Sequence, residues 1–282
     1  MEPDILNNEF INALRSHATD TLLDIVTLIY IGLFFYFIEK IRPADSSAKF
    51  FKKDFRTEIC YPLFNFIVSE PITRYIAVVI TVIALEPLFP YRVFDQQISN
   101  LPFPVQVFLA MLITDIAVYL EHRFAHTYLW PFHSMHHMTT EVSWITTFRV
   151  HPINSLTIVI VPTIIKFIIG FDGEAIIYAS YLTIILAIFQ HANINFGFSK
   201  PFCYLLVSPR FHRWHHAKEK AAIDKNFCLA FPFLDLIGGT YYCPEHLPSR
   251  YGVFDSKADP IPDSFLGQLW HPFRIMLAWK KK

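Results

Sequence analysis

Long apolar runs separated by short polar segments dominate the pattern of this 282-residue chain, and their lengths predict membrane-crossing helices. The run from Leu22 to Ile38 has 17 residues, which at the helical rise span about 26 Å, just enough to cross a bilayer. The longer stretch from Ile59 to Phe89 is interrupted by Glu70, Pro71 and Arg74. This interruption predicts one crossing with a polar, bent entry, or alternatively two half-helices.

Three further apolar runs lie in the middle of the chain. Residues 103–120 predict another crossing, whereas residues 153–169 and 174–190 predict a helical hairpin because a Gly-Phe-Asp-Gly turn signal separates them. Residues 264–279, near the end of a polar tail over 242–282, predict a helix at the membrane interface. The pattern therefore predicts an all-α fold, a polytopic membrane helical bundle with a helical cap, built as a single membrane domain over residues 1–282 with its N-terminal transmembrane helices within 22–120.

Positive charge predicts the orientation of this bundle. Six basic residues follow the first apolar run, so the positive-inside rule makes their loop cytoplasmic. Between His137 and His191 the chain makes an even number of predicted crossings, which places every histidine-rich segment at the same, cytoplasmic face. The basic residues of the loop are Lys40, Arg42, Lys49, Lys52, Lys53 and Arg56.

The composition agrees with a membrane protein and excludes some partners. Hydrophobic residues make up 53% of the chain and charged residues 17%, against roughly 25% charged in an average soluble domain. The net charge is zero, so nothing indicates nucleic-acid binding. The four cysteines form no CxxC pair and no disulfide framework.

Histidine is the unusual residue of this chain, since ten of its 13 histidines fall between His122 and His216. They form an HxxxH motif in EHRFAH and two HxxHH motifs, in FHSMHH and FHRWHH. On a helix, residues at i, i+3 and i+4 project from one face, so each motif is expected to aim its rings at one point. His191, at the end of the predicted hairpin, adds a further ring. The predicted ligands are His122, His126, His133, His136, His137, His191, His212, His215 and His216.

Metal coordination explains this clustering better than a purely structural role. One buried polar group without a partner costs roughly 1–3 kcal/mol, and nine such groups would exceed the total stability of a typical domain, about 5–15 kcal/mol. Neutral imidazole is a good ligand for iron, zinc and copper. Nine ligands are too many for one tetrahedral zinc ion but suit two ions with about four or five ligands each. Iron is the better assignment if the site handles oxygen, because zinc has no redox chemistry.

The region from about Tyr119 to Tyr241 carries these motifs in an order that resembles the fatty acid hydroxylase / sterol desaturase superfamily of membrane-bound di-iron oxygenases. An R-x-H-P segment at 149–152, an H-x-N segment at 191–193 and a D-x-N segment at 224–226 join the boxes, and a tail ending in G-G-T-Y at 238–241 closes the region. The departures from the family pattern at Leu120, Cys228, Leu234 and Gly238 remove no predicted ligand and bear on the substrate instead.

The resemblance implies a catalytic region over residues 119–241 that holds two Fe ions and uses O2 to hydroxylate or desaturate a membrane lipid. Relatives in the superfamily act on sterols, fatty acyl chains, ether lipids and carotenoids. Zinc binds such sites more tightly than ferrous iron and is expected to replace it in some purified samples. No GxGxxG fingerprint or fused haem domain is evident, which implies an external electron donor of the ferredoxin or cytochrome type.

Other polar residues are expected around the ligands. His151, Asn195 and Asp224 are candidates either for a ligand or for a group that hydrogen-bonds one. Metal-bound histidines usually need an acceptor for their second ring N–H. Five acids are candidate acceptors, and Arg123, Arg149 and Arg213 are expected to anchor loops, pair with acids or contact lipid headgroups. The acids are Asp115, Glu121, Glu141, Asp224 and Asp235.

Three other functions remain alternatives. A membrane metal sensor or transporter would usually bind its ion near the bilayer midplane, often between inverted repeats, and the sequence has no visible repeat. A transmembrane di-haem protein needs one or two axial histidines per haem on facing helices, which HxxHH fits poorly. A structural protein without activity would not need intact histidine boxes.

Overall fold

The computed structural model describes residues 22–47 apart from positions 24 and 28, and residues 55–80, 93–253 and 262–279. This part of the chain is predominantly helical and contains no strand, so the predicted all-α class is confirmed. The first helix comprises the described residues of the range 22–41. The remaining elements are α2 (Phe55–Phe64), η1 (Asn65–Ser69), α3 (Glu70–Ile80), α4 (Asp95–Ser99), α5 (Phe103–Tyr128), α6 (Trp130–His137), η4 (Trp144–Phe148), α7 (Pro152–Ile169), α8 (Gly173–His191), η5 (Phe202–Tyr204), α9 (Pro209–His215), η6 (Lys220–Ala222), α10 (Phe233–Ile237) and α11 (Phe265–Trp279).

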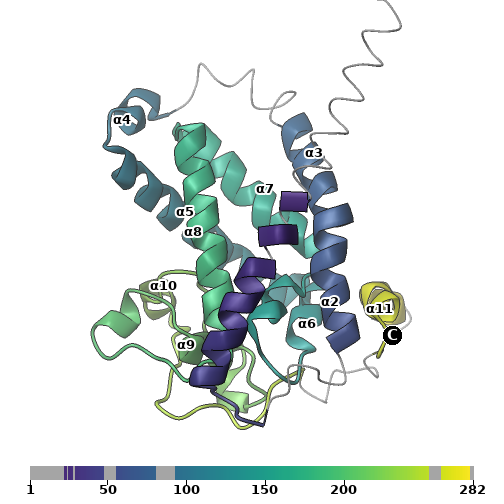
Figure 1. The fold of residues 1–282 in the computed structure, drawn as a ribbon. Coiled ribbons are helices and arrows are strands. Elements are labelled where there is room, and N and C mark those ends of the chain that lie inside the picture. The colour runs from purple at the N-terminus through teal and green to yellow at the C-terminus, as the bar shows by residue number, and fades with distance from the viewer. Residues whose placement is uncertain are drawn as a thin grey trace, which may run out of the picture.

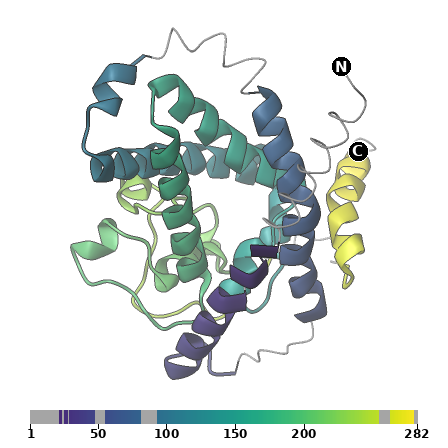
Figure 2. The ribbon, with the colours of Figure 1, turned by 45° about the horizontal axis from the view of Figure 1, so that its top comes forward.

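The long helices form a bundle, and the short helices α6, α9 and α10 gather at one end of it as a cap, whereas the short helix α4 lies at the other end (Figure 1). Helices α5, α7 and α8 are long and apolar enough to cross a membrane. Two views agree that α6 and α9 lie at the same end of the bundle, where α5 and α8 end and α7 begins (Figures 1 and 2). The fold therefore brings sequence-distant histidines to one end of the bundle, which we call the cap end.

Small side chains let the bundle helices pack closely. Ala110 on α5 and Ala175 and Ala179 on α8 are fully buried in one apolar cluster with Val107. Such residues allow helix backbones to approach each other, which favours association within lipid. Gly170 ends α7 in the left-handed conformation, with φ of 107°, a geometry that glycine adopts at little cost. This turn makes α7 and α8 the predicted helical hairpin.

Two helices differ from their predicted bounds. Helix α5 continues to Tyr128, eight residues beyond the predicted end at Leu120, so the first histidine motif lies on the same helix as the apolar run. The apolar stretch predicted to start at Ile59 is helical from Phe55 to Ile80 and contains a π-helical segment, η1, where the bend was expected. The remainder of that stretch, residues 81–89, lies outside the described residues.

Candidate metal centre

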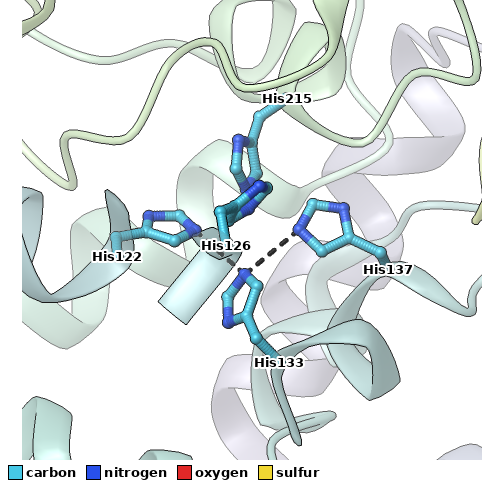
Figure 3. A group of neighbouring side chains, drawn as sticks. All are labelled: His122, His126, His133, His137 and His215. Carbon is cyan, nitrogen blue, oxygen red and sulfur yellow. Dashed lines mark hydrogen bonds between the residues drawn. The ribbon is translucent and has the colours of Figure 1, made fainter. Parts of the chain in front are cut away.

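Nine histidines from four helices meet at the cap end of the bundle in two groups. Within each group, one ring nitrogen from every histidine lies within 4.8 Å of the others. Figure 3 shows the rings of the first group pointing towards a common centre. Group A contains His122, His126, His133, His137 and His215, and group B contains His136, His191, His212 and His216.

Each HxxHH motif divides its histidines between the two groups. His133 and His137 of α6 point into group A and His136 into group B. In the second motif, His215 points into group A, and His212 and His216 point into group B. The prediction that one motif aims at a single point was therefore wrong. The physical reason is that residues i+3 and i+4 lie about 100° apart around a helix axis, so i and i+4 can share one centre while i+3 faces another.

Hydrogen bonds fix the orientation of most of these rings. In six of the nine histidines, Nδ1 lies 2.6–3.3 Å from an acceptor oxygen. A neutral imidazole carries one N–H, which must sit on the nitrogen that faces an acceptor. In these rings Nδ1 therefore donates and Nε2 presents a lone pair. The acceptors are the carbonyls of Phe227, Arg149, Ala187 and Lys225, and the side chains of Asp224 and Asn154.

The Nε2 atoms converge at distances that suit a shared cation. His122 and His137 each place Nε2 within 3.1 Å of His133 Nε2, and His136 and His212 do the same around His191. In group A, the buried Nε2 atoms of His126 and His215 have no hydrogen-bond partner. Lone pairs facing each other repel unless a positive ion lies among them. The residues present thus fit two metal ions, one per group, and histidine-only donors suit a borderline metal such as iron or zinc.

The cap histidines are poor bases, and this favours binding of a metal ion over protonation of the rings. Burial lowers the pKa of His133 to about 4. Burial, followed by the charges that neighbouring rings would carry, holds the pKa of the other cap histidines well below the usual range. Their rings are therefore neutral at physiological pH, the state in which imidazole binds metal. These histidines are His136, His137, His212, His215 and His216.

A short relay of polar side chains supports His133 from the bundle side. His133 Nδ1 lies 2.8 Å from Asn154 Oδ1, and Asn154 donates to Glu121 Oε1 at 3.0 Å. Thr157 also donates to Glu121 Oε1, at 2.6 Å. Glu121 thus acts on the histidine through Asn154. The role of Asn154 was not predicted from the sequence, although it is the one amide in the first turn of the apolar helix α7.

Two other acids bind backbone amides in place of histidines. Asp235 accepts from the amides of Phe227 and Cys228 and from the Thr240 hydroxyl, and Asp115 accepts from the amides of residues 229–231. Both carboxylates shape the segment whose Phe227 carbonyl orients His122. The fifth predicted acceptor, Glu141, lines a cavity of about 240 Å³ in the cap together with Glu39 and Glu58.

Buried arginines hold the loops of the cap, as expected from the sequence. Arg149 donates to the Met135 carbonyl at 2.9 Å and to Gln268 Oε1 of α11 at 2.9 Å. Arg213 donates to the carbonyls of Val142 and Ala192 and to Asn193 Oδ1. These contacts tie α6 to α11 and the end of α8 to α9. Arg123 donates to the Tyr119 hydroxyl at 3.2 Å.

Two of the three residues predicted to be either a ligand or a hydrogen-bond partner of one, His151 and Asn195, lie outside both groups. His151 caps α7 by accepting from the Ile153 amide, and its Nε2 lies 3.3 Å from the Leu269 carbonyl. Helix α8 ends at His191, so Asn195 is no longer on the helix face that carries His191. The Asn195 amide donates to the Arg42 carbonyl at 2.9 Å. In contrast, Asp224 accepts from His126 Nδ1 at 3.0 Å and supports a histidine of group A.

Fold and site together define a class of protein: a helical protein with three helices long and apolar enough to span a membrane and nine histidines placed to bind metal at one end of them. Residues 107–240 match the model of the fatty acid hydroxylase family. This match and the relatives below support a place for these residues in the fatty acid hydroxylase / sterol desaturase superfamily.

Two kinds of relatives are similar to parts of the chain. Ornithine lipid hydroxylase OlsE of Rhizobium tropici is 29% identical over 174 residues, which cover 61% of this chain and 51% of that protein. Very-long-chain aldehyde decarbonylase GL1-1 of Oryza sativa, in subspecies indica and japonica, is 54% identical over 37 residues, or 13% of this chain and 5% of the relative. The chain therefore spans at most about half the length of these curated relatives. No solved structure matches the chain.

The Asp224 carboxylate gives a test of the outer contacts of group A. Replacing Asp224 with Asn keeps the size of the side chain but weakens its bond to His126 Nδ1. Removal of such contacts typically lowers metal affinity by about 10- to 100-fold. We expect a loss of this size for one of two bound ions, measured by competition with a chelator. Equal weakening of both ions would contradict the assignment of Asp224 to group A.

Proposed function

We propose that this chain is an O2-dependent lipid hydroxylase or desaturase that holds one iron ion in each histidine group. The observation that carries the proposal is the convergence of nine imidazoles whose Nδ1 atoms are largely anchored outwards. The match to the fatty acid hydroxylase family and the likeness to a lipid hydroxylase support it. The nine proposed ligands are those of groups A and B, and the catalytic region is residues 119–241 within a single membrane domain.

Iron, when bound, supplies the redox chemistry with O2 that oxidises an unactivated C–H bond of a lipid. The residues of the chain orient the ligands and exclude water. The ring of Phe227 lies 4.9 Å from that of His126 and 5.3 Å from that of His122, and Trp130 lies 5.1 Å from His126. Such apolar rings keep water away from a reactive centre. Zinc is an expected replacement in purified protein because it binds such sites more tightly than ferrous iron.

The membrane arrangement follows from charge and from the long helices. We propose a multi-pass protein with the cap on the cytoplasmic side, because the basic segment 40–56 follows the end of the first helix. Pro43, just beyond that end, bridges to Ile194 in the cap. A cap in the cytoplasm gives an external ferredoxin- or cytochrome-type donor access to the metal centre. The lipid substrate enters from the bilayer.

The lipids of expressing cells test this function. A double variant, His133→Ala/His136→Ala, removes one ligand from each group while leaving the rest of α6 in place. We expect lipids that gain one oxygen or one double bond in cells expressing the unmodified chain and not in cells expressing the variant, compared by mass spectrometry. The control His246→Ala alters an exposed histidine outside both groups and should behave as the parent. Metal binding without any change in lipids, with a suitable donor supplied, would favour the sensor or transporter alternative.

A further inference from the structure

The segment from Phe227 to Tyr241, which follows the last histidine box, is packed along the side of α5. At its start, the Phe227 carbonyl accepts from His122 at 2.8 Å. Further along, the Phe231 ring lies 5.7 Å from the ring of Phe108 on α5. After α10, a Cβ on Gly238 would overlap the Tyr119 hydroxyl, so the chain returns in direct contact with α5. In Figure 1, α10 lies below the labelled part of α5 and just above α9.

These contacts reach far from the cap end of α5. Asp115 lies seven residues and Phe108 fourteen residues before His122, which correspond to about 10 Å and 21 Å along a helix axis. The hydrocarbon core of a bilayer is about 30 Å thick. If the histidines of α5 lie near the membrane surface, the segment 227–241 lies beside the part of α5 that the bilayer surrounds.

Five backbone amides of this segment have hydrogen-bond acceptors within the protein, as a segment inside a membrane requires. Irregular backbone at membrane depth has no water to bond to and needs partners within the protein. Two carboxylates supply them: Asp115 accepts from three consecutive amides, at 2.6, 3.1 and 2.6 Å, and Asp235 accepts from two more, at 2.8 and 2.9 Å. Both acids are buried, with 1% and 0% of their surface exposed. In a loop exposed to water, solvent could bond these five amides instead.

The tip of the segment exposes apolar side chains where lipid would be. Ile237 is 81% exposed and Leu236 is 45% exposed. The adjoining face of α5 is apolar and exposed as well, with Leu120 at 60% next to the Tyr119 that contacts Gly238. The exposed surface of the tip is thus continuous with the surface of a helix able to span a membrane. Exposed apolar patches of this kind mark membrane or protein contacts.

We propose that residues 227–241 form a re-entrant segment whose exposed tip, Leu236 and Ile237, lies in the hydrocarbon on the cap side of the bilayer, while residues 229–231 lie deeper along α5. Its base reaches the metal centre, since the Phe227 ring lies 4.9–5.9 Å from the rings of His126, His122 and His215. The segment thus links the lipid-facing surface beside α5 to the rings of group A. This inference deepens the proposed function and rests on its placement of α5 in the membrane.

Photolabelling from within the bilayer tests the proposal on the unmodified full-length chain. The protein is reconstituted into phosphatidylcholine nanodiscs that contain a phospholipid with a diazirine in its acyl chain. After illumination, peptide mass spectrometry measures the labelled fraction of each peptide. The peptide with Leu120 and Phe124 reports whether α5 faces lipid. The peptide with Ile41, which is also 81% exposed but ends the first helix at the cap, controls for exposure alone.

We expect the peptide containing residues 233–237 to be labelled as strongly as the α5 peptide, and at least about tenfold more than residues 245–250 of the cap, which hydrocarbon does not reach. Labelled α5 with unlabelled 233–237 would overturn the re-entrant segment and leave the proposed membrane enzyme intact. Absence of label from both would overturn the membrane placement of α5 and the inference with it. Label on residues 233–237 that disappears when two chains are cross-linked would assign the tip to a chain–chain contact and also overturn it. None of these readings depends on bound metal or activity.

Discussion

Replacing His136 and His212 with alanine is expected to lower the metal content of the purified protein from two ions per chain to one. Both side chains belong to group B, which would keep only His191 and His216, whereas all five histidines of group A remain. Two imidazoles are too few to hold a divalent ion firmly against solvent and chelator, since protein sites for zinc use three or four protein ligands. Metal analysis of detergent-purified protein, after anaerobic loading with ferrous iron, measures the change.

The mirror variant, His122→Ala/His133→Ala/His215→Ala, should lose the other ion, because it leaves group A with only His126 and His137. Either variant should lose lipid oxidation completely if the two ions act together. The His246→Ala variant serves as the control and should retain both ions. Loss of both ions from each of the two variants, in protein that remains folded, would contradict two separable groups and indicate one cooperative cluster.

The helices of the bundle could be predicted from the sequence because the residues that determine them are close together in the chain. An apolar run of membrane length and a glycine at a turn determine helix and hairpin within a few neighbouring residues. The start of α7 at Pro152 and its end at Ile169, just before Gly170, follow from such signals. The end of α5 does not, because the helix continues past the apolar run into residues 121–128, where His122 and His126 contact segments that are distant in sequence.

The assignment of histidines to groups could not be read from spacing. It depends on how α6 and α9 face each other, which brings His137 and His215 rings to 4.6 Å and places His136 opposite His216, also at 4.6 Å. Spacing within one motif contains no information about the partner motif. The same limit applies to the acids, which were predicted to be partners of histidines. Asp115 instead binds amides more than a hundred residues later in the chain, and Asp235 binds the amides seven and eight residues before it.

This pairing of two carboxylates with five amides makes the segment 227–231 the support of group A. Its first carbonyl fixes His122, and its aromatic ring covers three histidines of the group. The apolar tip of α10 depends on the same two acids. The metal centre and the surface that meets lipid are therefore shaped by one short stretch of chain, and a change to either acid should affect both.

Replacing Asp235 with Asn should therefore destabilise the protein strongly. The carboxylate accepts three buried hydrogen bonds, from two amides and from Thr240, and hydrogen bonds to a charged group contribute roughly 1.5–3 kcal/mol each. An asparagine can accept with only one of its two terminal atoms, and its NH2 would face an amide N–H. We expect a loss of several kcal/mol of unfolding free energy, which corresponds to a fall in Tm on the order of 10 °C for a domain of this size.

The matched control is Asp224→Asn. The Asp224 side chain is 64% exposed, and its carboxylate makes a single hydrogen bond to the site, with His126 Nδ1. Its effect on metal-free stability should stay below about 1 kcal/mol, as for other exposed pairs. Thermal unfolding of the metal-free proteins in detergent measures both. Asp115→Asn should resemble Asp235→Asn, and the double variant should lose less than the sum, because both acids hold one segment. A Tm for Asp235→Asn equal to that of the parent would show that the amides find other partners, and the segment would then owe its position to packing against Tyr119 and Phe108.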